Sequence, residues 1–279
     1  MTETIAELFT QRFGLDMEGA PDDAVGGEVV QTILAHRTHR RFLPDPVSDE
    51  VMEVLLACAY SAPSKSDLQQ ASVLRVIDED KREAIAALIP SMPWIGTAPQ
   101  FMVFCGDSRR IRQICEKRGK PFANDHLDAF FNATVDAALT MQNLVTAAEA
   151  SGLGCCPISV IRNHATRVSE ILQLPAWVFP VAGLCLGYPS AKAFVGMRLP
   201  LFATVHVDTY DETALERELD DYDRRRDAGY SIPDEKQKYV DDYGRAEFYG
   251  WSEDKARQVS RPERDDFGDF VRHQGFVLD

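Results

Sequence analysis

Residues 35–42 read Ala-His-Arg-Thr-His-Arg-Arg-Phe, which places five cationic or titratable side chains and one hydroxyl in a single short stretch. The apolar spacing of residues 28–36 predicts a helix that runs into this stretch, and Pro44 and Pro46 predict a turn after it. Guanidinium, imidazole and hydroxyl groups are donors that favour phosphate or carboxylate. The residues alone leave two interpretations open, an anion-binding site or a solvated helix end.

The rest of the chain is acidic, which sets this basic stretch apart. Its 279 residues are 45% hydrophobic and 27% charged, and the formal net charge is -14. This size and composition indicate one large globular domain or a core domain with an excursion. Because phosphate backbones attract broad basic surfaces, the acidic balance argues against a protein that binds nucleic acid or an anionic membrane.

The cysteines and the ends of the chain indicate a compartment. The six cysteines lie mostly in apolar runs without C-x-x-C spacing, which is typical of buried thiols in a reducing environment. The vicinal pair Cys155 and Cys156 is interpreted as a buried strand end rather than a redox pair. No secretory signal pattern begins the chain, and residues 177–188 are too short and too interrupted by Pro and Gly to span a bilayer. We expect a cytoplasmic protein without structural disulfides.

Hydrophobic periodicity predicts an alternation of helices and strands. The predicted helices cover residues 4–13, 28–36, 51–58, 80–89, 125–151 and 166–172. The predicted strands cover residues 72–77, 101–105, 178–186 and 205–207, and residues 154–160 are predicted to run from a strand into a loop. Residues 90–99 are expected to be irregular. The apolar run at 101–105 predicts a strand buried on both faces. Residues 125–151 form the longest periodic segment and are predicted to be the central core helix.

Beyond residue 210 the composition changes. Residues 211–223 are predicted to form an acidic helix, residues 227–245 are polar with Gly and Pro, and residues 260–273 are expected to form a docked helix. We therefore predict three regions: an N-terminal extension over 1–27, a core over 28–210, and a C-terminal arm with a docked helix over 211–279.

Several familiar catalytic patterns are missing from the sequence. Gly152-Leu153-Gly154 lacks the third glycine of a dinucleotide fingerprint, and no P-loop pattern occurs. The histidines have no metal-ligand spacing, and no nucleophile elbow is present, so we propose no metal. If the chain is an enzyme, its chemistry is expected to reside in a bound cofactor. The polar loop around Ser64 and Ser66 could donate to a ligand or could simply be a solvated loop.

An ordered series of short motifs resembles the FMN-dependent nitroreductase family, and most closely its branch of NADPH-preferring flavin reductases and oxygen-insensitive nitroreductases. The motifs lie at residues 35–42, 64–69, 147–154, 161–163, 184–189 and 198–200, with looser similarity at 250–252 and 260–262. The resemblance implies an α+β fold with a central, mostly antiparallel sheet flanked by helices. It also implies an interleaved homodimer in which both chains hold FMN at the interface.

The resemblance assigns cofactor-binding roles to the basic stretch. His36, Arg37 and Thr38 would surround the FMN phosphate and ribityl chain, and Arg198 would complete the phosphate clamp. Arg40 would approach the N1/O2 edge of the isoalloxazine. A cation suits that edge because reduced flavin carries negative charge at N1. Arg40 is therefore expected to tune the flavin, whose N5 carries the chemistry.

Two further segments receive flavin contacts from the same resemblance. Ser64 and Ser66 would bond ribityl or pyrimidine atoms from one side. Pro157, Ile158 and Ser159 would lie along the flavin ring. These assignments follow the position of each residue within a motif.

The resemblance implies ping-pong electron transfer. NADPH would pass hydride to the flavin, and a nitroaromatic, quinone or flavin acceptor would then take two electrons, with no protein acid or base required. A cation would be needed for the 2′-phosphate of NADPH, and Arg224, Arg225 and Arg226 are the candidates. These arginines could instead neutralise the neighbouring aspartates. The second interpretation of the whole chain is a non-catalytic flavin- or anion-binding member of the fold.

Four positions depart from the pattern of this branch. Gly196 stands where the branch usually has a Lys, and Ser159 and Val160 stand where it usually has two glycines under the flavin. Met92 replaces an expected Gln and is a weak hydrogen-bonding partner for the polar edge of the flavin. The departures leave the acceptor and the nicotinamide preference open.

Overall fold

The computed structural model describes residues 3–16 and 27–279, and the chain divides into two compact units. Unit 1 comprises Met1–His36 and Phe194–Glu263, and unit 2 comprises Arg37–Ala193 and Arg264–Asp279. The units group residues that pack together, whereas the three predicted regions divide the chain by composition, so the boundaries after residues 27 and 210 stay a prediction. In the described part of the chain, no helix combines the length and apolarity that crossing a membrane requires.

Unit 2 is built on a four-stranded sheet in the order β1-β2-β4-β3. Its strands are β1 (Ala71–Arg75), β2 (Gln100–Asp107), β3 (Gly154–Ile158) and β4 (Val178–Gly187). Every neighbouring pair is antiparallel, which confirms the predicted mostly antiparallel sheet. The predicted strand at 205–207 is wrong, because Val205 and Val207 are 60% and 80% exposed and lie in a loop after a short 3-10 turn.

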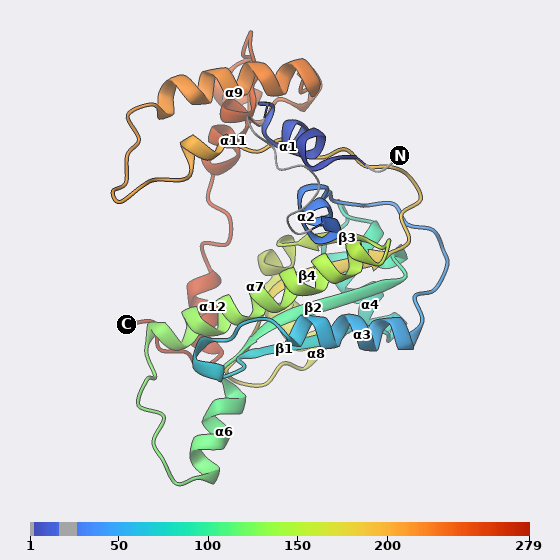
Figure 1. The fold of residues 1–279 in the computed structure, drawn as a ribbon. Coiled ribbons are helices and arrows are strands. Elements are labelled where there is room, and N and C mark those ends of the chain that lie inside the picture. Colours follow the sequence, from blue (N-terminus) through green and yellow to red (C-terminus); the bar gives the residue numbers. More distant parts are fainter. Residues whose placement is uncertain (1–2, 17–26) are drawn as a thin grey trace. The chain divides into compact units, whose positions relative to one another are not determined.

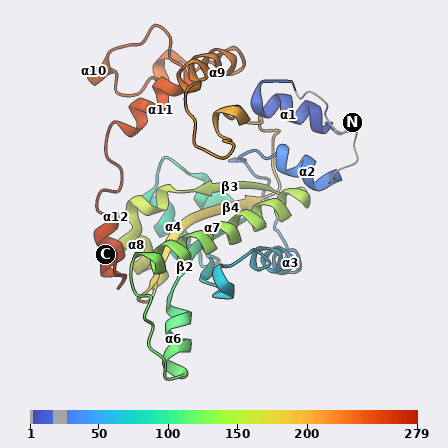
Figure 2. The same cartoon turned by 60° about the vertical axis from the view of Figure 1, so that its left-hand side comes forward.

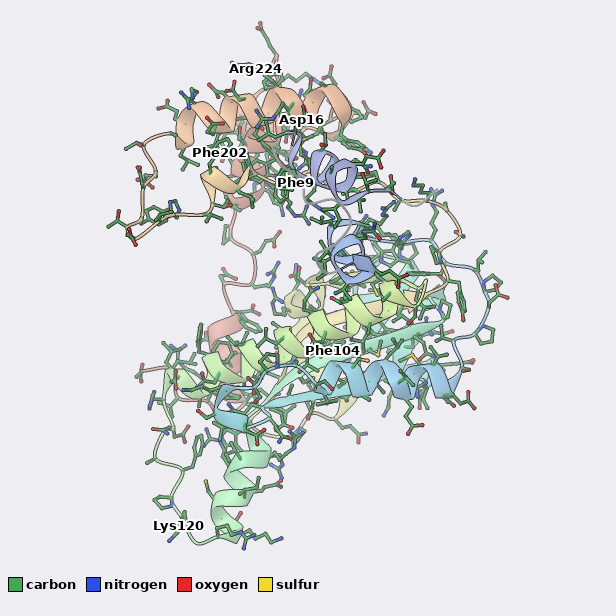
Figure 3. All side chains as sticks on the ribbon, in the orientation of Figure 1. Phe9, Asp16, Phe104, Lys120, Phe202 and Arg224 are labelled. Carbon is green, nitrogen blue, oxygen red and sulfur yellow. The ribbon has the colours of Figure 1, made fainter. Side chains whose placement is uncertain are left out.

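Helices cover both faces of this sheet, as Figures 1 and 2 show. The helices of unit 2 are α3 (Asp49–Tyr60), α4 (Glu79–Leu88), α5 (Trp94–Thr97), α6 (Arg109–Lys117), α7 (Leu127–Ala150), α8 (Ala165–Leu172) and α12 (Phe267–His273). Along β2, Phe101 and Val103 pack with α4 and α8, whereas Met102 and Phe104 pack with α3 and α7; Phe104 is labelled in Figure 3. The alternation explains why this strand is apolar throughout and confirms its burial on both faces.

Helix α7 rests on the sheet through its small residues. Ala133 and Ala137 are fully buried, because side chains of this size let a helix approach a sheet closely. Large apolar residues recur at every fourth position on another face and are 36–61% exposed in the single chain, namely Leu127, Phe131, Val135 and Leu139. The prediction of a core helix is therefore confirmed for the alanine face and wrong for these four residues.

Other helices of unit 2 differ in part from the predictions. Residues 90–99 contain the short helix α5, and α6 was not predicted. The helix predicted over 260–273 begins only at Phe267. Pro262 disfavours helical backbone at the residue before it, and Arg264 has a φ of 60°, outside the right-handed helical region. The docking of this tail is confirmed, because Phe270 and Val271 are buried against Phe179.

Unit 1 contains helices from both ends of the chain. They are α1 (Ile5–Phe13), α2 (Gly27–Leu34), α9 (Leu215–Gly229), α10 (Val240–Tyr243) and α11 (Trp251–Val259). Thr4 and Glu7 form a capping box at the start of α1, and Gly14, with φ 64°, ends it in the left-handed conformation. The predicted helix at 4–13 is thereby confirmed. Most of the loop expected over 14–27 lies outside the described residues.

Candidate functional site

The basic stretch at 35–42 lies where the two units join along the chain. Helix α2 ends at Leu34, and the carbonyl of His36 accepts a hydrogen bond from the guanidinium of Arg12 within unit 1. In unit 2, Thr38 forms a parallel bridge with Cys155, and the His39 N–H donates to the Cys155 carbonyl at 2.8 Å. The stretch is therefore tied to β3 by backbone contacts.

Gly154 permits this close approach of the basic stretch to β3. A Cβ at position 154 would lie 2.8 Å from both Cβ and Cγ of His39. Because a Cβ is fixed to its own backbone, neither segment could keep its place with a larger residue there. The absence of a side chain at Gly154 thus decides how the residues after His36 run.

Cationic side chains of this stretch face different surroundings. The Arg37 guanidinium donates to the Ala193 carbonyl at 3.3 Å, and Arg37 lines a cavity of about 470 Å³ together with His39 and Lys192. The Arg40 guanidinium lies 5.8 Å from the centre of the Trp94 ring. Arg37 and Lys192 together can bind an anion, which is the chemistry predicted for this stretch.

Residues 157–159 continue β3 beyond its bridge with Thr38. Pro157 and Ser159 are exposed, whereas Ile158 is 1% exposed and packs in the core, so only its backbone can meet a ligand. The substituted positions Val160 and Met92 also pack against that core. Their side chains are half-buried against it.

The loop containing Ser64 and Ser66 is held by an acid that sequence reasoning missed. Asp136 of α7 is 2% exposed and accepts hydrogen bonds from the Ser64 hydroxyl at 2.7 Å, the Lys65 N–H at 3.0 Å and the Gln70 N–H at 2.9 Å. One carboxylate thus satisfies donors at both ends of the loop. The sequence signal that could have identified Asp136 is its spacing of three residues from Ala133, which places an acid on the buried face of the helix.

The same loop is strained, and one of its buried polar atoms has no partner. Ser66, Asp67 and Gln69 have φ of 50°, 57° and 52°, which is the left-handed region that residues other than glycine rarely adopt. Within the described chain, Nε2 of the buried Gln70 lacks a hydrogen-bond partner. Gln70 and Asp136 line a cavity of about 180 Å³. Strain and an unsatisfied amide are features that cluster at ligand sites.

The two predicted flavin-contacting regions of unit 2 lie at opposite corners of the sheet. Cys155, beside the basic stretch, pairs with Leu186 of β4. Ala71, which follows the Ser64 loop, pairs with Gly106 of β2, and Gly106 pairs with Phe179 of β4. Phe179 and Leu186 are separated by about 23 Å along the strand, at roughly 3.3 Å a residue. These residues of one chain therefore do not converge on one point.

A second cationic cavity, of about 530 Å³, lies within unit 1. Three cations and three aromatic residues are among those that line it, namely Arg198, Arg226, Lys255, Phe13, Tyr222 and Trp251. Arg226 donates to the Tyr222 hydroxyl at 3.0 Å, and the Tyr222 and Trp251 rings meet edge to face at 5.2 Å. Cations beside aromatic faces suit a ligand that carries both phosphate and a planar ring.

The other two predicted phosphate-binding arginines of α9 have different environments. Arg224 is exposed, is labelled in Figure 3, and pairs with Asp221 at 3.0 Å. Nε and Nη2 of Arg225 are buried and lack a hydrogen-bond partner in the described chain. Of the three arginines, Arg226 is the one that lines the cavity.

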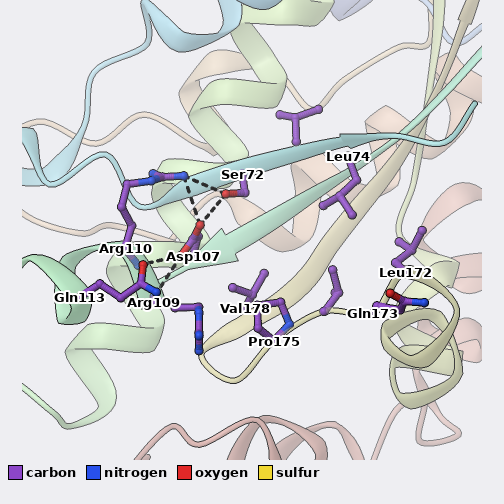
Figure 4. Close-up of a pocket in the computed structure, with 12 residues that line it drawn as sticks. Ser72, Leu74, Asp107, Arg109, Arg110, Gln113, Leu172, Gln173, Pro175 and Val178 are labelled. Atoms are coloured by element: carbon purple, nitrogen blue, oxygen red, sulfur yellow. Dashed lines mark hydrogen bonds and ion pairs between the residues drawn. The ribbon is translucent and has the colours of Figure 1, made fainter.

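A further cavity of about 390 Å³ opens beside β1, where Arg110, Asp107 and Ser72 form a closed set of contacts (Figure 4). The Arg110 guanidinium lies 3.2 Å from the Asp107 carboxylate and donates to Ser72 at 2.9 Å. These groups satisfy one another, and none of the residues predicted for the flavin lines this cavity.

Comparison with known proteins identifies the family. The sequence profile of the nitroreductase family matches residues 33–188, and the profile of the nitroreductase family C-terminal domain matches residues 197–279. The chain belongs to the nitroreductase family. This membership confirms the resemblance drawn from the motifs, and the sheet flanked by helices confirms the expected fold class.

Individual relatives of this nitroreductase-family protein align over most of its length. An FMN reductase (NADPH) of Bacillus subtilis is 30% identical over 88% of this chain and 97% of its own. An oxygen-insensitive NADPH nitroreductase of Salmonella typhimurium is 38% identical over 67% of this chain and 78% of its own. The solved NADPH:FMN oxidoreductase of Vibrio harveyi, complexed with NAD+, is 30% identical, with a TM-score of 0.78 over 89% of this chain and 98% of its own.

Proposed function

We propose that this nitroreductase-family protein is an FMN-dependent oxidoreductase that takes hydride from NAD(P)H, with NADPH favoured. It passes two electrons by a ping-pong mechanism to nitroaromatic, quinone or flavin acceptors. The observation that carries this function is the match of both family profiles, together with relatives named as NADPH-dependent FMN reductases and nitroreductases. The alternative of a non-catalytic binding protein is not favoured, because those relatives are reductases.

The residues present suit FMN, which would supply the hydride-accepting N5 when bound. Arg37 lines a cavity with Lys192, and that pair of cations offers charge-assisted donors to a phosphate. Thr38 lies between Arg37 and His39, which both line this cavity, and a bridge ties it to β3. We propose that these residues, with His36 and Arg198, hold the phosphate and ribityl chain, and that Arg40 stabilises negative charge at the flavin edge.

A second copy of the chain is proposed to complete the site. The loop with Ser64 and Ser66 lies at the opposite corner of the sheet from Thr38, which is bridged to Cys155, so residues of one chain surround a flavin from one side only. The exposed apolar stripe of α7 offers a contact surface for the second copy. We propose a homodimer in which the Ser64 loop of one chain faces the basic stretch of the other.

The cation-lined cavity of unit 1 is proposed to bind the phosphates of the nicotinamide cosubstrate. Among Arg224, Arg225 and Arg226, the last is favoured for the 2′-phosphate because it lines the cavity beside Lys255. Arg224 instead neutralises a neighbouring aspartate, since it pairs with Asp221. The cytoplasm is the compartment that we propose, because the six cysteines are free thiols.

Absorbance spectroscopy of the purified protein tests the function. The protein as isolated, or after reconstitution with FMN, is expected to show flavin absorbance that bleaches when NADPH is added without oxygen. Addition of a quinone or nitroaromatic should restore the absorbance. Bound flavin that neither NADPH nor NADH reduces would support the non-catalytic alternative, and a protein that FMN cannot colour would overturn both.

A further inference from the structure

Arg12 of α1 is a buried side chain that joins two segments of unit 1 far apart in the sequence. It is 6% exposed. Its guanidinium donates to the carbonyls of Leu34 at 2.9 Å, Gly196 at 2.7 Å and His36. The backbone of the same residue accepts from the Arg198 N–H at 2.6 Å. One residue therefore fixes the backbone at His36 and at Arg198, both of which are proposed to contact the FMN phosphate.

The end of α1 also forms part of the cationic cavity of unit 1. Phe13 lines that cavity. Gly14 packs against the loop before Arg198, because a Cβ at Gly14 would lie 3.0 Å from Cε of Met197. The Met197 carbonyl in turn accepts a hydrogen bond from the Tyr222 hydroxyl at 3.0 Å. Contacts thus run continuously from α1 to the residues of α9 that line the cavity.

Helix α1 lies outside the part of the chain that the family profiles match, which begins at residue 33. We propose that Arg12 is a positioning residue for phosphate binding and that α1 is a structural part of the cationic cavity. This inference rests on the proposed function. Arg12 itself does not contact the ligand; it acts through the backbone of His36 and Arg198.

The physical basis is the geometry of the guanidinium. Its five N–H donors lie in a fixed plane, so Arg12 can reach three carbonyls that point inward from two segments. A lysine at this position carries the same charge but concentrates its donors at one atom. Without the fork, residues 34–36 and 196–198 lose their common partner. The side chains of His36 and Arg198 then become disordered relative to each other, and binding a phosphate must order them.

Three variants test the proposal: Arg12→Ala, Arg12→Lys and the control Gln11→Ala. Gln11 is an exposed neighbour in α1 whose amide donates to Glu3. We expect Arg12→Ala to raise the Kd for FMN about tenfold. This size corresponds to loss of one charge-assisted hydrogen bond between the FMN phosphate and a side chain that Arg12 positions. Arg12→Lys should lie between, and Gln11→Ala should match the wild type. At saturating FMN, Arg12→Ala should raise the KM for NADPH with kcat within about twofold of wild type, since Arg12 is proposed to act on phosphate binding and not on the hydride-transfer step.

A purely structural role for Arg12 predicts a different result, in which the melting temperature falls while the Kd for FMN and the KM for NADPH stay at wild-type values. That result in a folded variant overturns the proposal. If wild-type protein itself binds no FMN and oxidises no NADPH, it is the proposed function that has failed.

Hydrogen exchange of the wild-type protein provides a test that needs no variant. Because coupling between sites is reciprocal, a ligand that orders the segments at His36 and Arg198 must also protect α1. Saturating FMN is expected to slow exchange of the amides of Ile5–Phe13. Unchanged exchange in α1, with slowed exchange at residues 37–40, would overturn the role of α1 while leaving FMN binding intact.

Discussion

At the scale of single residues, Asp136 shows how a buried acid can prepare a binding loop. Its carboxylate accepts from a hydroxyl and two backbone N–H groups of the Ser64 loop. Three residues of that loop have positive φ, a strain that persists only where surrounding contacts impose it. Asp136 holds both ends of the loop, and the Ser64 hydroxyl and the Arg110 guanidinium contact the backbone of the strained Gln69. The loop is therefore expected to keep its shape before a ligand arrives.

The substitution Asp136→Asn tests this role. An amide has one acceptor oxygen and directs its NH2 toward the donors of the loop, so at least one donor is left unsatisfied, at a cost of about 1–3 kcal/mol of stability. We expect a lower melting temperature and weaker FMN retention. Asp128→Asn is the matched control on α7, because Asp128 is exposed and accepts only from the Asn132 amide among the described side chains. Equal FMN retention in both variants would contradict the assignment.

Arg226 and Arg217 offer a matched comparison for nicotinamide binding. Both lie on α9, but Arg226 lines the cavity of unit 1, whereas Arg217 is 76% exposed and pairs with Glu218. Arg226→Ala is expected to raise the KM for NADPH about tenfold, by loss of a charge-assisted contact, and to leave the KM for NADH nearly unchanged. Arg217→Ala should change neither KM. If Arg226→Ala affects NADPH and NADH alike, the 2′-phosphate assignment is wrong.

At the scale of elements, the pairing of β3 with the basic stretch depends on Gly154. We expect Gly154→Ala to push His39 away from β3 and to cost about 1–3 kcal/mol of stability, the range for overpacking. FMN retention should fall with it, because Arg37 and Thr38 shift together. Gly229→Ala is the control, since a Cβ there meets nothing within 4 Å. Thermal unfolding and bound-flavin content measure the difference, and a Gly154→Ala protein like wild type in both would refute the dependence.

The connection between α6 and α7 predicts an acid-sensitive contact. Arg112 donates to both oxygens of Asp125, at 2.8 Å and 2.5 Å, and these hydrogen bonds hold the pKa of Asp125 below its usual value. A depressed pKa stabilises the fold above the unfolded value of about 3.9, and this contribution is lost as the pH falls through the folded pKa.

We therefore expect Asp125→Asn to lower the free energy of unfolding by roughly 1 kcal/mol at pH 7. Below about pH 4 the variant should lose little further stability from this contact, because it has no carboxylate to protonate there. The wild-type protein should approach the variant as the medium is acidified. Asp45→Asn, at an exposed position, is the control and should track the wild type at every pH. Urea unfolding across the acid range provides the measurement, and a constant gap between wild type and Asp125→Asn would count against the contact.

At the scale of the whole molecule, the stripe on α7 supports an assembly of two chains. Leu127, Phe131, Val135 and Leu139 share one helix face and are partly exposed in the single chain. Contiguous apolar surface of this kind typically marks an interface. An interface on α7 would also lie close to Asp136 and the loop that it holds.

Light scattering after gel filtration tests the assembly. The wild-type protein is expected at about twice the chain mass of 31.2 kDa. Phe131→Glu buries a charge in the proposed interface and should shift the protein toward monomer, with loss of bound FMN. Ile77→Glu adds the same charge at a position 76% exposed outside α7 and should remain dimeric. A monomeric wild-type protein that retains FMN would overturn the shared site.

The local elements of this protein could be predicted from sequence because their signals are local. Thr4 and Ser48 cap helices where their side chains reach a nearby N–H, and the apolar run of β2 indicated burial on both faces. Where a signal depended on a partner, prediction failed. The segment with Val205 and Val207 has strand composition, but no strand pairs with it among the described residues.

The sequence by itself determined the family, the expected flavin chemistry and the basic stretch at 35–42, because ordered motifs and charges are properties of the linear chain. Only the tertiary structure decided where that stretch runs, through the bridge of Thr38 to Cys155 and the missing Cβ of Gly154. It alone revealed Arg12 and Asp136, whose partners lie up to 184 and 72 residues away. Such contacts leave no local periodicity, because burial and hydrogen bonding between distant segments arise only when the chain has folded.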